Sequence, residues 1–203
     1  MNRREYARRG ATVYATARRL EAMRGLQEQG VTVLKLDVTN AEDIQCRTNF
    51  SLLYPNTRQR AIETIMLEAQ ITSVFSALSQ HAVETIMKEA GRIDVLINNA
   101  AVFATRPLAD TPLPDWHAMF ETNLLGVVAM AQAVFPHMAE RKQGLVVNVS
   151  SCAGYCHLPM AAAYSASKAA LNAATNCMRM EMKPFGVQVM LAVPGFIKTK
   201  IHR

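Results

Sequence analysis

The chain has 203 residues, of which 50% are hydrophobic and 19% are charged, and this length and composition are those of a single globular domain with one core. The formal net charge of +6 does not predict nucleic-acid binding, because the basic residues are dispersed apart from the pairs at 3–4 and 8–9 and few aromatic residues accompany them.

Targeting and metal signals are not evident either. The four cysteines show no paired metal-ligand spacing, so we expect no metal site and a reduced intracellular compartment. Residues 1–10 are charged and lack the apolar core of a signal peptide. The longest apolar stretch, residues 124–135, is shorter than the ~20 residues that a membrane-spanning helix needs, so we expect no transmembrane segment.

The first 38 residues predict a strand, a helix and a second strand. Residues 11–16 are rich in β-branched residues and follow Gly10, residues 18–29 have a helical pattern that Gly30 ends, and residues 31–36 form the next strand. Asp37 and Val38 come at its carboxyl end. Short joints between such elements are typical of the βαβ unit of a parallel sheet.

Residues 46–80 interrupt this pattern. Residues 61–69 nearly repeat residues 82–90, twenty-one positions later. Two units are too few for a solenoid, which needs at least three. We interpret 46–80 as an atypical insert, from a local duplication or retained non-coding sequence rather than a regulatory segment.

The second half predicts three further strands with polar residues at their ends. Residues 92–97 lead to Asn98 and Ala100, residues 144–149 lead to Ser150 and Ser151, and residues 187–193 lead to a Pro-Gly pair. A long helix from Pro114 or Asp115 through Ala139, with Asn123 near its middle, separates the first two strands. Open α/β proteins place ligands at the carboxyl ends of their strands.

Tyr164 and Lys168 lie four residues apart in an Ala-rich segment, 161–174, that has a helical pattern. Positions i and i+4 share one helix face, and a cation beside a phenol favours the phenolate, which makes the phenol a proton donor near neutrality. The pair alone is also a common accident of helix surfaces. Ser151, thirteen residues before Tyr164 at a strand end, favours the functional interpretation, with Ser150 as the alternative serine.

With these motifs, over residues 7–45 and 81–201, the chain resembles the short-chain dehydrogenase/reductase family. The resemblance implies an α/β fold with a Rossmann-like, doubly wound parallel sheet in one domain, 1–203. No Gly-rich dinucleotide turn occurs in the sequence. We therefore expect a chain truncated at both ends, without the family's first strand and C-terminal elements.

The resemblance also implies roles for individual residues. Asn123, Ser151, Tyr164 and Lys168 match the catalytic tetrad. Tyr164 would give a proton to the substrate oxygen, Ser151 would hold that oxygen, and Lys168 would favour the phenolate and bind the nicotinamide ribose. Asn123 would anchor a water in the proton relay. The matching cofactor positions are Asp37 and Val38 for adenine, Asn98 and Ala100 for the adenosine half, and Pro194, Gly195, Ile197 and Thr199 for the nicotinamide.

The end of the first predicted strand indicates the cofactor. An NAD enzyme usually has an acidic residue there for the ribose 2′-hydroxyl, whereas this chain has Arg18 and Arg19. A guanidinium pair suits a 2′-phosphate, which predicts NADP(H). The alternative is that the two arginines are only the solvated start of a helix.

Residues 13–19 and 181–187 resemble the acyl-dihydroxyacetone-phosphate reductase branch, which shares features with retinol and steroid dehydrogenases. This implies a small or lipid-like carbonyl substrate, reduced with NADPH. We expect a cytoplasmic homo-oligomer, with peripheral contact to the endoplasmic reticulum or a lipid droplet surface. The alternative is a catalytically impaired family member that acts only as a binding or dimerisation module.

Overall fold

The computed structural model describes residues 13–17, 25, 31–35 and 76–195. The chain divides into two compact units, residues 1–91 and 92–203, and each contains its own parallel sheet. The expectation of one domain over 1–203 stays a prediction.

The first unit contains two of the predicted strands. β1 (Val13–Ala17) pairs in parallel with β2 (Val31–Lys35), with Val13 opposite Val31. The described end of this unit is a helix over residues 76–90. Residues 76–80, assigned above to the insert, therefore continue directly into the helical pattern of 81–90, and residues 46–75 lie outside the described residues.

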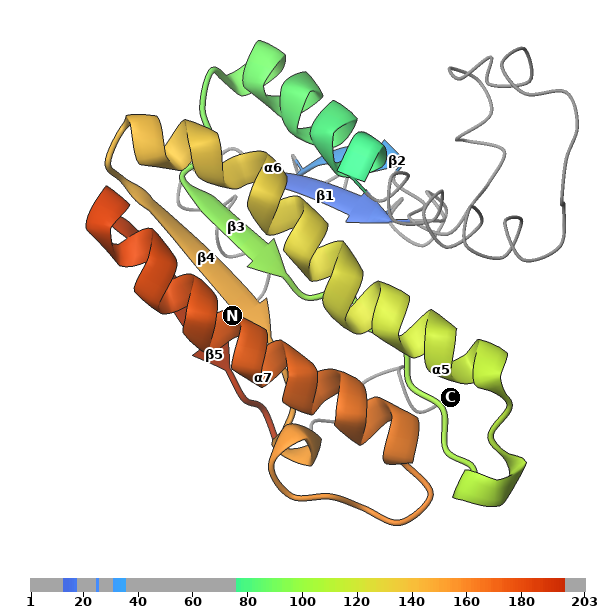
Figure 1. Cartoon of the computed structure of the whole chain (residues 1–203). Coiled ribbons are helices and arrows are strands. Elements are labelled where there is room, and N and C mark those ends of the chain that lie inside the picture. The colour runs from blue at the N-terminus through green and yellow to red at the C-terminus, as the bar shows by residue number, and fades with distance from the viewer. Residues whose placement is uncertain (1–12, 18–24, 26–30, 36–75, 196–203) are drawn as a thin grey trace, which may run out of the picture. The chain divides into compact units, whose positions relative to one another are not determined.

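The second unit contains a three-stranded sheet with the order β3 (Val95–Asn98), β4 (Gly144–Val149) and β5 (Val187–Ala192). Both pairings are parallel, and Asn98 lies opposite Asn148. Consecutive strands are connected through helices, which run along the sheet in Figure 1. Parallel strands joined by helical crossovers are the α/β architecture that the sequence predicts, and this fold class is confirmed.

The connection from β3 to β4 is one long helical segment. It consists of α5 (Leu113–Phe120), a π-helical turn (Glu121–Leu125) and α6 (Gly126–Glu140). Proline in the first turn of α5 is favourable, because the first N–H groups of a helix have no acceptor within the helix, so a residue without an N–H loses no hydrogen bond there. The predicted bounds of this helix differ from the observed ones by one or two residues.

This segment also has the length and composition of a membrane-spanning helix. Residues 113–140 form 28 helical residues, and their most apolar window has a mean hydropathy of 1.4 and is 44% buried inside the protein. It is the one helix with these properties among the described residues. A core helix of a soluble protein passes the same test, so the helix is weak evidence for a membrane span.

The β4–β5 connection carries the Tyr-x-x-x-Lys motif. A single 3-10 turn, η4 (Cys152–Gly154), follows β4, and α7 (Ala162–Met182) and a second turn, η5 (Lys183–Phe185), lead to β5. Gly186 then reverses the chain with a φ of 73°, a conformation that favours glycine. The predicted bounds of β4 and β5 are close to the observed ones, whereas α7 continues eight residues beyond the predicted helical segment, 161–174.

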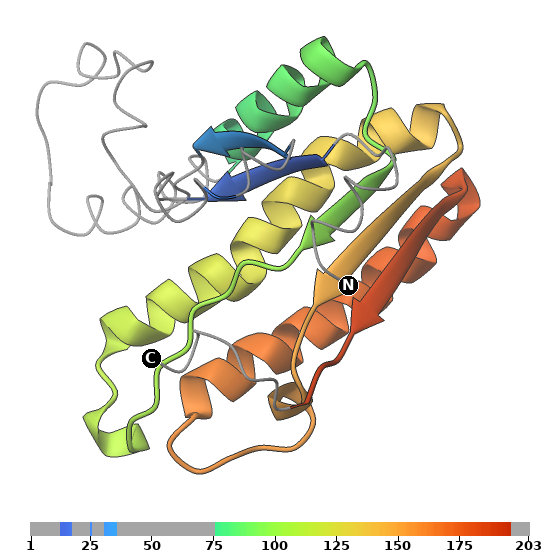
Figure 2. The same cartoon turned by 180° about the vertical axis from the view of Figure 1, so that it is seen from behind.

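Side chains alternate across the three-stranded sheet, as the two-residue repeat of a strand requires. Val146 and Val189 are buried with Leu171 of α7. The opposite face, seen from behind in Figure 2, carries Ile97, which is 45% exposed, and Met190, which is 52% exposed. The helices α6 and α7 therefore pack on one face and define the core of this unit.

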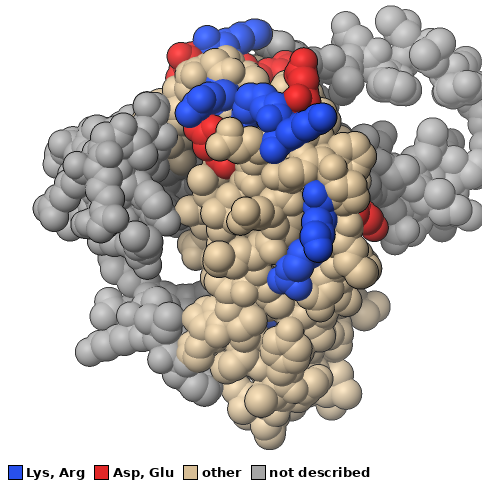
Figure 3. All heavy atoms as spheres, turned by 90° about the vertical axis from the view of Figure 1, so that its left-hand side faces the viewer, with Lys and Arg blue, Asp and Glu red and all other residues tan. Residues whose placement is uncertain are grey.

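Charged residues on this unit occur in mixed groups. Arg92 and Arg141 lie 3.1 and 3.8 Å from the carboxylate oxygens of Asp94, and Arg106 lies 3.8 Å from Asp115. On the face shown in Figure 3, basic side chains lie in the upper part beside acidic ones, and a further group of basic side chains lies below them.

Candidate active site

Three strand ends of the second unit meet at one edge of the sheet. Asn98 ends β3, Ser150 and Ser151 follow β4, and Pro194 follows β5. The Ser150 N–H donates to the Ala192 carbonyl at 2.8 Å, and the Cys152 N–H donates to the Pro194 carbonyl at 3.0 Å. Backbone pairing thus continues beyond β4 and β5 and holds the residues that follow these two strands side by side.

Tyr164 and Lys168 lie one turn apart on α7, as their spacing predicts. The Lys168 Nζ lies 5.9 Å from the centre of the Tyr164 ring and donates to the Val149 carbonyl at 3.0 Å. Lys168 is only 2% exposed, and this burial lowers its pKa from 10.5 to about 8, because desolvation disfavours the ammonium. The residue therefore remains a cation at neutral pH, with its charge largely removed from water.

The two serines after β4 have different surroundings. Ser150 is 4% exposed, and its hydroxyl donates to the Asn172 Oδ1 at 2.5 Å. Ser151 is half-buried, and its Oγ accepts the Ala153 N–H at 3.2 Å, which caps the η4 turn. The Ser151 O–H donates to no group among the described residues, so Ser151 is the serine available to a ligand.

Asn123 lies in the π-helical turn and is fully buried. Its Oδ1 accepts the Val102 N–H at 2.9 Å, and its Nδ2 donates to the Val102 carbonyl at 3.1 Å and to the Ser167 Oγ at 3.0 Å. These bonds explain an asparagine in a helix interior, where its propensity is unfavourable. Single π turns inside α-helices are frequent at functional sites. The water-holding role that the resemblance implies stays a prediction.

The loop after β3 contributes a residue that sequence reasoning missed. The Phe103 ring packs edge-to-face on the Tyr164 ring, with the centroids 4.8 Å apart. This geometry is favourable for aromatic pairs and limits the positions that the phenol can adopt. An aromatic residue in a proline-containing loop carries no spacing signal that would have identified it.

A second missed residue, Asn148, lies inside the sheet. The Asn98 Nδ2 donates to the Asn148 Oδ1 at 2.9 Å, and the Asn148 Nδ2 donates to the Thr175 Oγ1 of α7 at 3.0 Å. Asn98 is thereby held between β4 and α7. A polar residue at an inward position of an otherwise apolar strand was the available signal, since buried polar groups need partners.

The remaining predicted cofactor residues divide into two groups. Ala100 and Gly195 are exposed, and a Cβ added to Gly195 would meet no atom within 4 Å. The others lie outside the described residues: Arg18, Arg19, Asp37, Val38, Ile197 and Thr199.

The described residues fit the nicotinamide and ribose end of a nicotinamide dinucleotide. An ammonium group has three donors, and the buried Lys168 has one acceptor, the Val149 carbonyl, among the described residues. A ribose hydroxyl is a suitable acceptor for a remaining donor. The open backbone at Gly195 allows close approach of a flat ring.

The comparisons with known proteins identify a family. The family model for short chain dehydrogenases matches residues 55–203. The chain is 32% identical over 198 residues to the NADPH-dependent 1-acyldihydroxyacetone phosphate reductase of Schizosaccharomyces pombe, and covers 55% of that protein with 98% of its own length.

Two solved structures share the fold. The gluconate 5-dehydrogenase of Burkholderia cenocepacia, in complex with NADP and tartrate, has a TM-score of 0.72 and 25% identity, with 95% of this chain and 64% of that chain covered. An NAD+-bound xylitol dehydrogenase has a TM-score of 0.75 and 23% identity, with 98% and 66% covered.

The chain thus spans only part of these proteins, about half of the yeast reductase. The family model nevertheless matches well over half of the chain, and the matched region includes the long helix with Asn123, the two serines and the Tyr164–Lys168 pair. The chain belongs to the short-chain dehydrogenase family.

Proposed function

We propose that this protein is an NADPH-dependent oxidoreductase that reduces a carbonyl group to an alcohol, with Tyr164 as the proton donor. The observation that carries the proposal is the buried Lys168 ammonium, 5.9 Å from the centre of the Tyr164 ring, beside a strand end that presents Ser151. Membership of an oxidoreductase family supports it.

Each residue of the site has a chemical role in this proposal. The Ser151 O–H donates to the substrate carbonyl oxygen and polarises it, while the cofactor supplies a hydride for the carbonyl carbon. The Tyr164 O–H transfers its proton to the same oxygen, which becomes the alcohol. The Lys168 ammonium stabilises the phenolate left behind. Carbonyl, NADPH and a proton give alcohol and NADP+.

The preference for NADPH rests on Arg18 and Arg19, and the names of two related proteins support it: one is called NADPH-dependent and one was solved with NADP. The NAD+-bound relative shows the same fold with the other cofactor, so the fold itself does not select between them.

Replacing Arg18 by alanine should weaken NADPH binding roughly 10- to 100-fold and leave NADH binding within twofold, because a hydrogen bond to a charged group contributes about 1.5–3 kcal/mol. Dissociation constants from the quenching of protein fluorescence by each cofactor measure this. Arg179→Ala removes an arginine whose described partners are Asn176 and the Val189 carbonyl, and serves as the control. Equal losses for both cofactors would refute the 2′-phosphate assignment.

The substrate is proposed to be a hydrophobic carbonyl compound. Phe103 provides an apolar wall beside the phenol, and Leu158 and Met160, in the segment before α7, are 43% and 53% exposed. The name of the yeast relative refers to an acyl-bearing substrate, which supports a lipid-like molecule. A lipid substrate in turn supports a cytoplasmic protein at the surface of the endoplasmic reticulum or of lipid droplets, which a fluorescent fusion would test.

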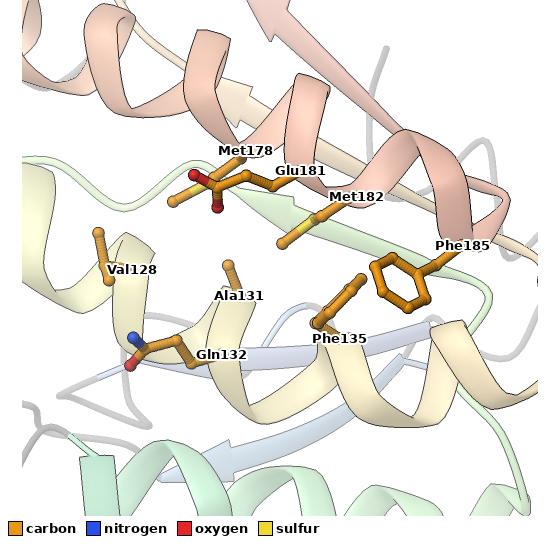
Figure 4. Close-up of a pocket in the computed structure, with 8 residues that line it drawn as sticks. All are labelled: Val128, Ala131, Gln132, Phe135, Met178, Glu181, Met182 and Phe185. Carbon is orange, nitrogen blue, oxygen red and sulfur yellow. The ribbon is translucent and has the colours of Figure 1, made fainter.

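A dimeric state is the second part of the proposal, and an apolar hollow between α6 and α7 supports it. The hollow has a volume of about 300 Å³ (Figure 4). Its apolar lining consists of Val128, Ala131 and Phe135 from α6, Met178 and Met182 from α7, and Phe185 from η5. Phe185 is 48% exposed and packs edge-to-face on Phe135, with the centroids 5.4 Å apart. Apolar side chains at a surface hollow favour a second protein surface there, and we assign it to another copy of the chain.

Phe185→Glu should convert a dimer into a monomer, because it places a charge where an aromatic side chain would be buried between two copies. Sedimentation velocity across a range of concentrations measures the change. Leu113→Glu, at a position 72% exposed at the start of α5, is the matched control and should leave the dimer intact. A chain that dimerises but binds no NADPH would favour the alternative function, a dimerisation module without catalysis.

A further inference from the structure

A closed circuit of contacts connects the Tyr164 backbone to the Tyr164 side chain, and Ser167 is part of it. The Ser167 hydroxyl donates to the Tyr164 carbonyl at 2.8 Å. The Ser167 Oγ also accepts a hydrogen bond from the Asn123 Nδ2 at 3.0 Å. One hydroxyl, fully buried, thus connects α7 to the π-helical turn of the long helix.

The circuit closes through the loop after β3. Asn123 binds both the N–H and the carbonyl of Val102, at 2.9 and 3.1 Å. The next residue, Phe103, packs edge-to-face on the Tyr164 ring at 4.8 Å. Starting from the Tyr164 backbone, the contacts therefore pass through Ser167, Asn123 and the loop and return to the Tyr164 side chain.

We infer that Ser167 is a positioning residue for Tyr164, acting through Asn123 and the Phe103 loop. This inference rests on the proposed function, in which Tyr164 donates the proton. Without the hydroxyl, the Asn123 Nδ2 would lose one of its two acceptors and its amide plane would be held by Val102 alone. The restraint that Asn123 places on the loop, and through it on the Phe103 ring, would then be weaker.

A serine that donates to the carbonyl three residues before it is common in helices and by itself indicates nothing about function. The bond from Asn123 distinguishes Ser167 from such a serine. The neighbouring Ser165 provides the comparison: it is 3% exposed on the same helix, and its Oγ has no hydrogen-bond partner within the described part of the chain. The buried hydroxyls of Ser165 and Ser167 therefore differ: only that of Ser167 is hydrogen-bonded to Asn123.

The test compares Ser167→Ala with Ser165→Ala in the whole chain, using two measurements. The first is kcat for reduction of a hydrophobic aldehyde with NADPH: Ser167→Ala should lower it about five- to twentyfold with the KM for NADPH within twofold, and Ser165→Ala should change neither. The second is the ring signal of Tyr164 in NMR spectra of protein with 13C-labelled tyrosine, assigned with Tyr164→Phe. It should shift or broaden in Ser167→Ala and not in Ser165→Ala.

The conservative variant Ser167→Thr keeps the hydroxyl and should restore both readouts to within about threefold of the original protein, by the size of one retained hydrogen bond. Where Ser167→Ala does not fold, Ser167→Cys, with its weak donor and acceptor, replaces it in the comparison. The inference is overturned if Ser167→Ala and Ser165→Ala give the same kcat and the same Tyr164 ring signal. It is also overturned if Ser167→Thr lowers kcat and shifts the signal as much as Ser167→Ala does.

The two measurements separate this inference from the proposed function. Where the original chain reduces no carbonyl but the Tyr164 signal responds to Ser167 alone, the proposed function fails and the positioning role stands. Where the original chain is active and the two serine variants are alike, the proposed function stands and the positioning role fails.

Discussion

Phenylalanine at position 164 should lower kcat for carbonyl reduction by roughly 10²- to 10⁴-fold, the range of a lost general acid, while the stability of the protein changes by less than about 0.5 kcal/mol. The Tyr164 hydroxyl has no hydrogen-bond partner among the described residues, so its removal breaks no described contact. The edge-to-face packing on Phe103 involves only the ring, which phenylalanine retains. Loss of the rate without loss of the fold is therefore the expected result.

Steady-state kinetics with NADPH and urea unfolding measure the two quantities, and fluorescence titration shows whether cofactor binding is retained. Tyr155→Phe is the matched control, because Tyr155 lies nine residues earlier and is 57% exposed. It should keep the original rate. A Tyr164→Phe protein whose kcat is within threefold of that of the original protein would exclude the tyrosine as proton donor.

The strands were predictable because each is a short apolar, β-branched run bounded by glycine. Gly144 opens β4, and Gly186 precedes β5 with a positive φ that other residues rarely adopt. The long helix was predictable from its proline-marked start and its 3.6-residue pattern. The π turn at Asn123 was not, because an extra residue inside a helix leaves no local sequence signal.

Part of the site was predictable for a similar reason. Tyr164 and Lys168 are neighbours because of helix geometry alone, and Ser151 is at the sheet edge because β4 ends there. The contacts of Phe103 with Tyr164 and of Asn123 with Ser167 join segments 61 and 44 positions apart. Such pairings depend on how the elements pack, which no local pattern specifies.

The burial of Lys168 was likewise not predictable, and it has an energetic consequence. A shift of the pKa from 10.5 to about 8 corresponds to about 3 kcal/mol that the folded state loses by holding a desolvated ammonium at pH 7. Between pH 8 and 10.5 the unfolded chain binds this proton and the folded chain does not. The free energy of unfolding therefore gains a contribution that rises with pH across that window.

Replacing Lys168 by methionine should consequently stabilise the protein at pH 7, by about 1–3 kcal/mol, while lowering kcat roughly 10²- to 10³-fold. The gain is smaller than the desolvation energy because the Val149 carbonyl loses its partner, at a cost of about 1–2 kcal/mol. The stability difference between the two proteins should narrow by roughly 2 kcal/mol from pH 7 to pH 10, since the original lysine becomes neutral. Other groups that titrate in this range are present in both proteins and cancel in the difference.

Urea unfolding of both proteins at pH 7 and pH 10 tests this. Lys183→Met is the control, because it removes the charge of an exposed lysine. That variant should show no pH-dependent difference. The ammonium would not be desolvated if the Lys168→Met protein were less stable than the original at pH 7. The same would follow if the difference in the free energy of unfolding between the two proteins were equal at pH 7 and pH 10. An ammonium in water would interact only weakly with the phenolate, because the attraction between two charges falls as the dielectric constant rises. The same measurement of stability thus tests the electrostatic basis of the proposed catalysis.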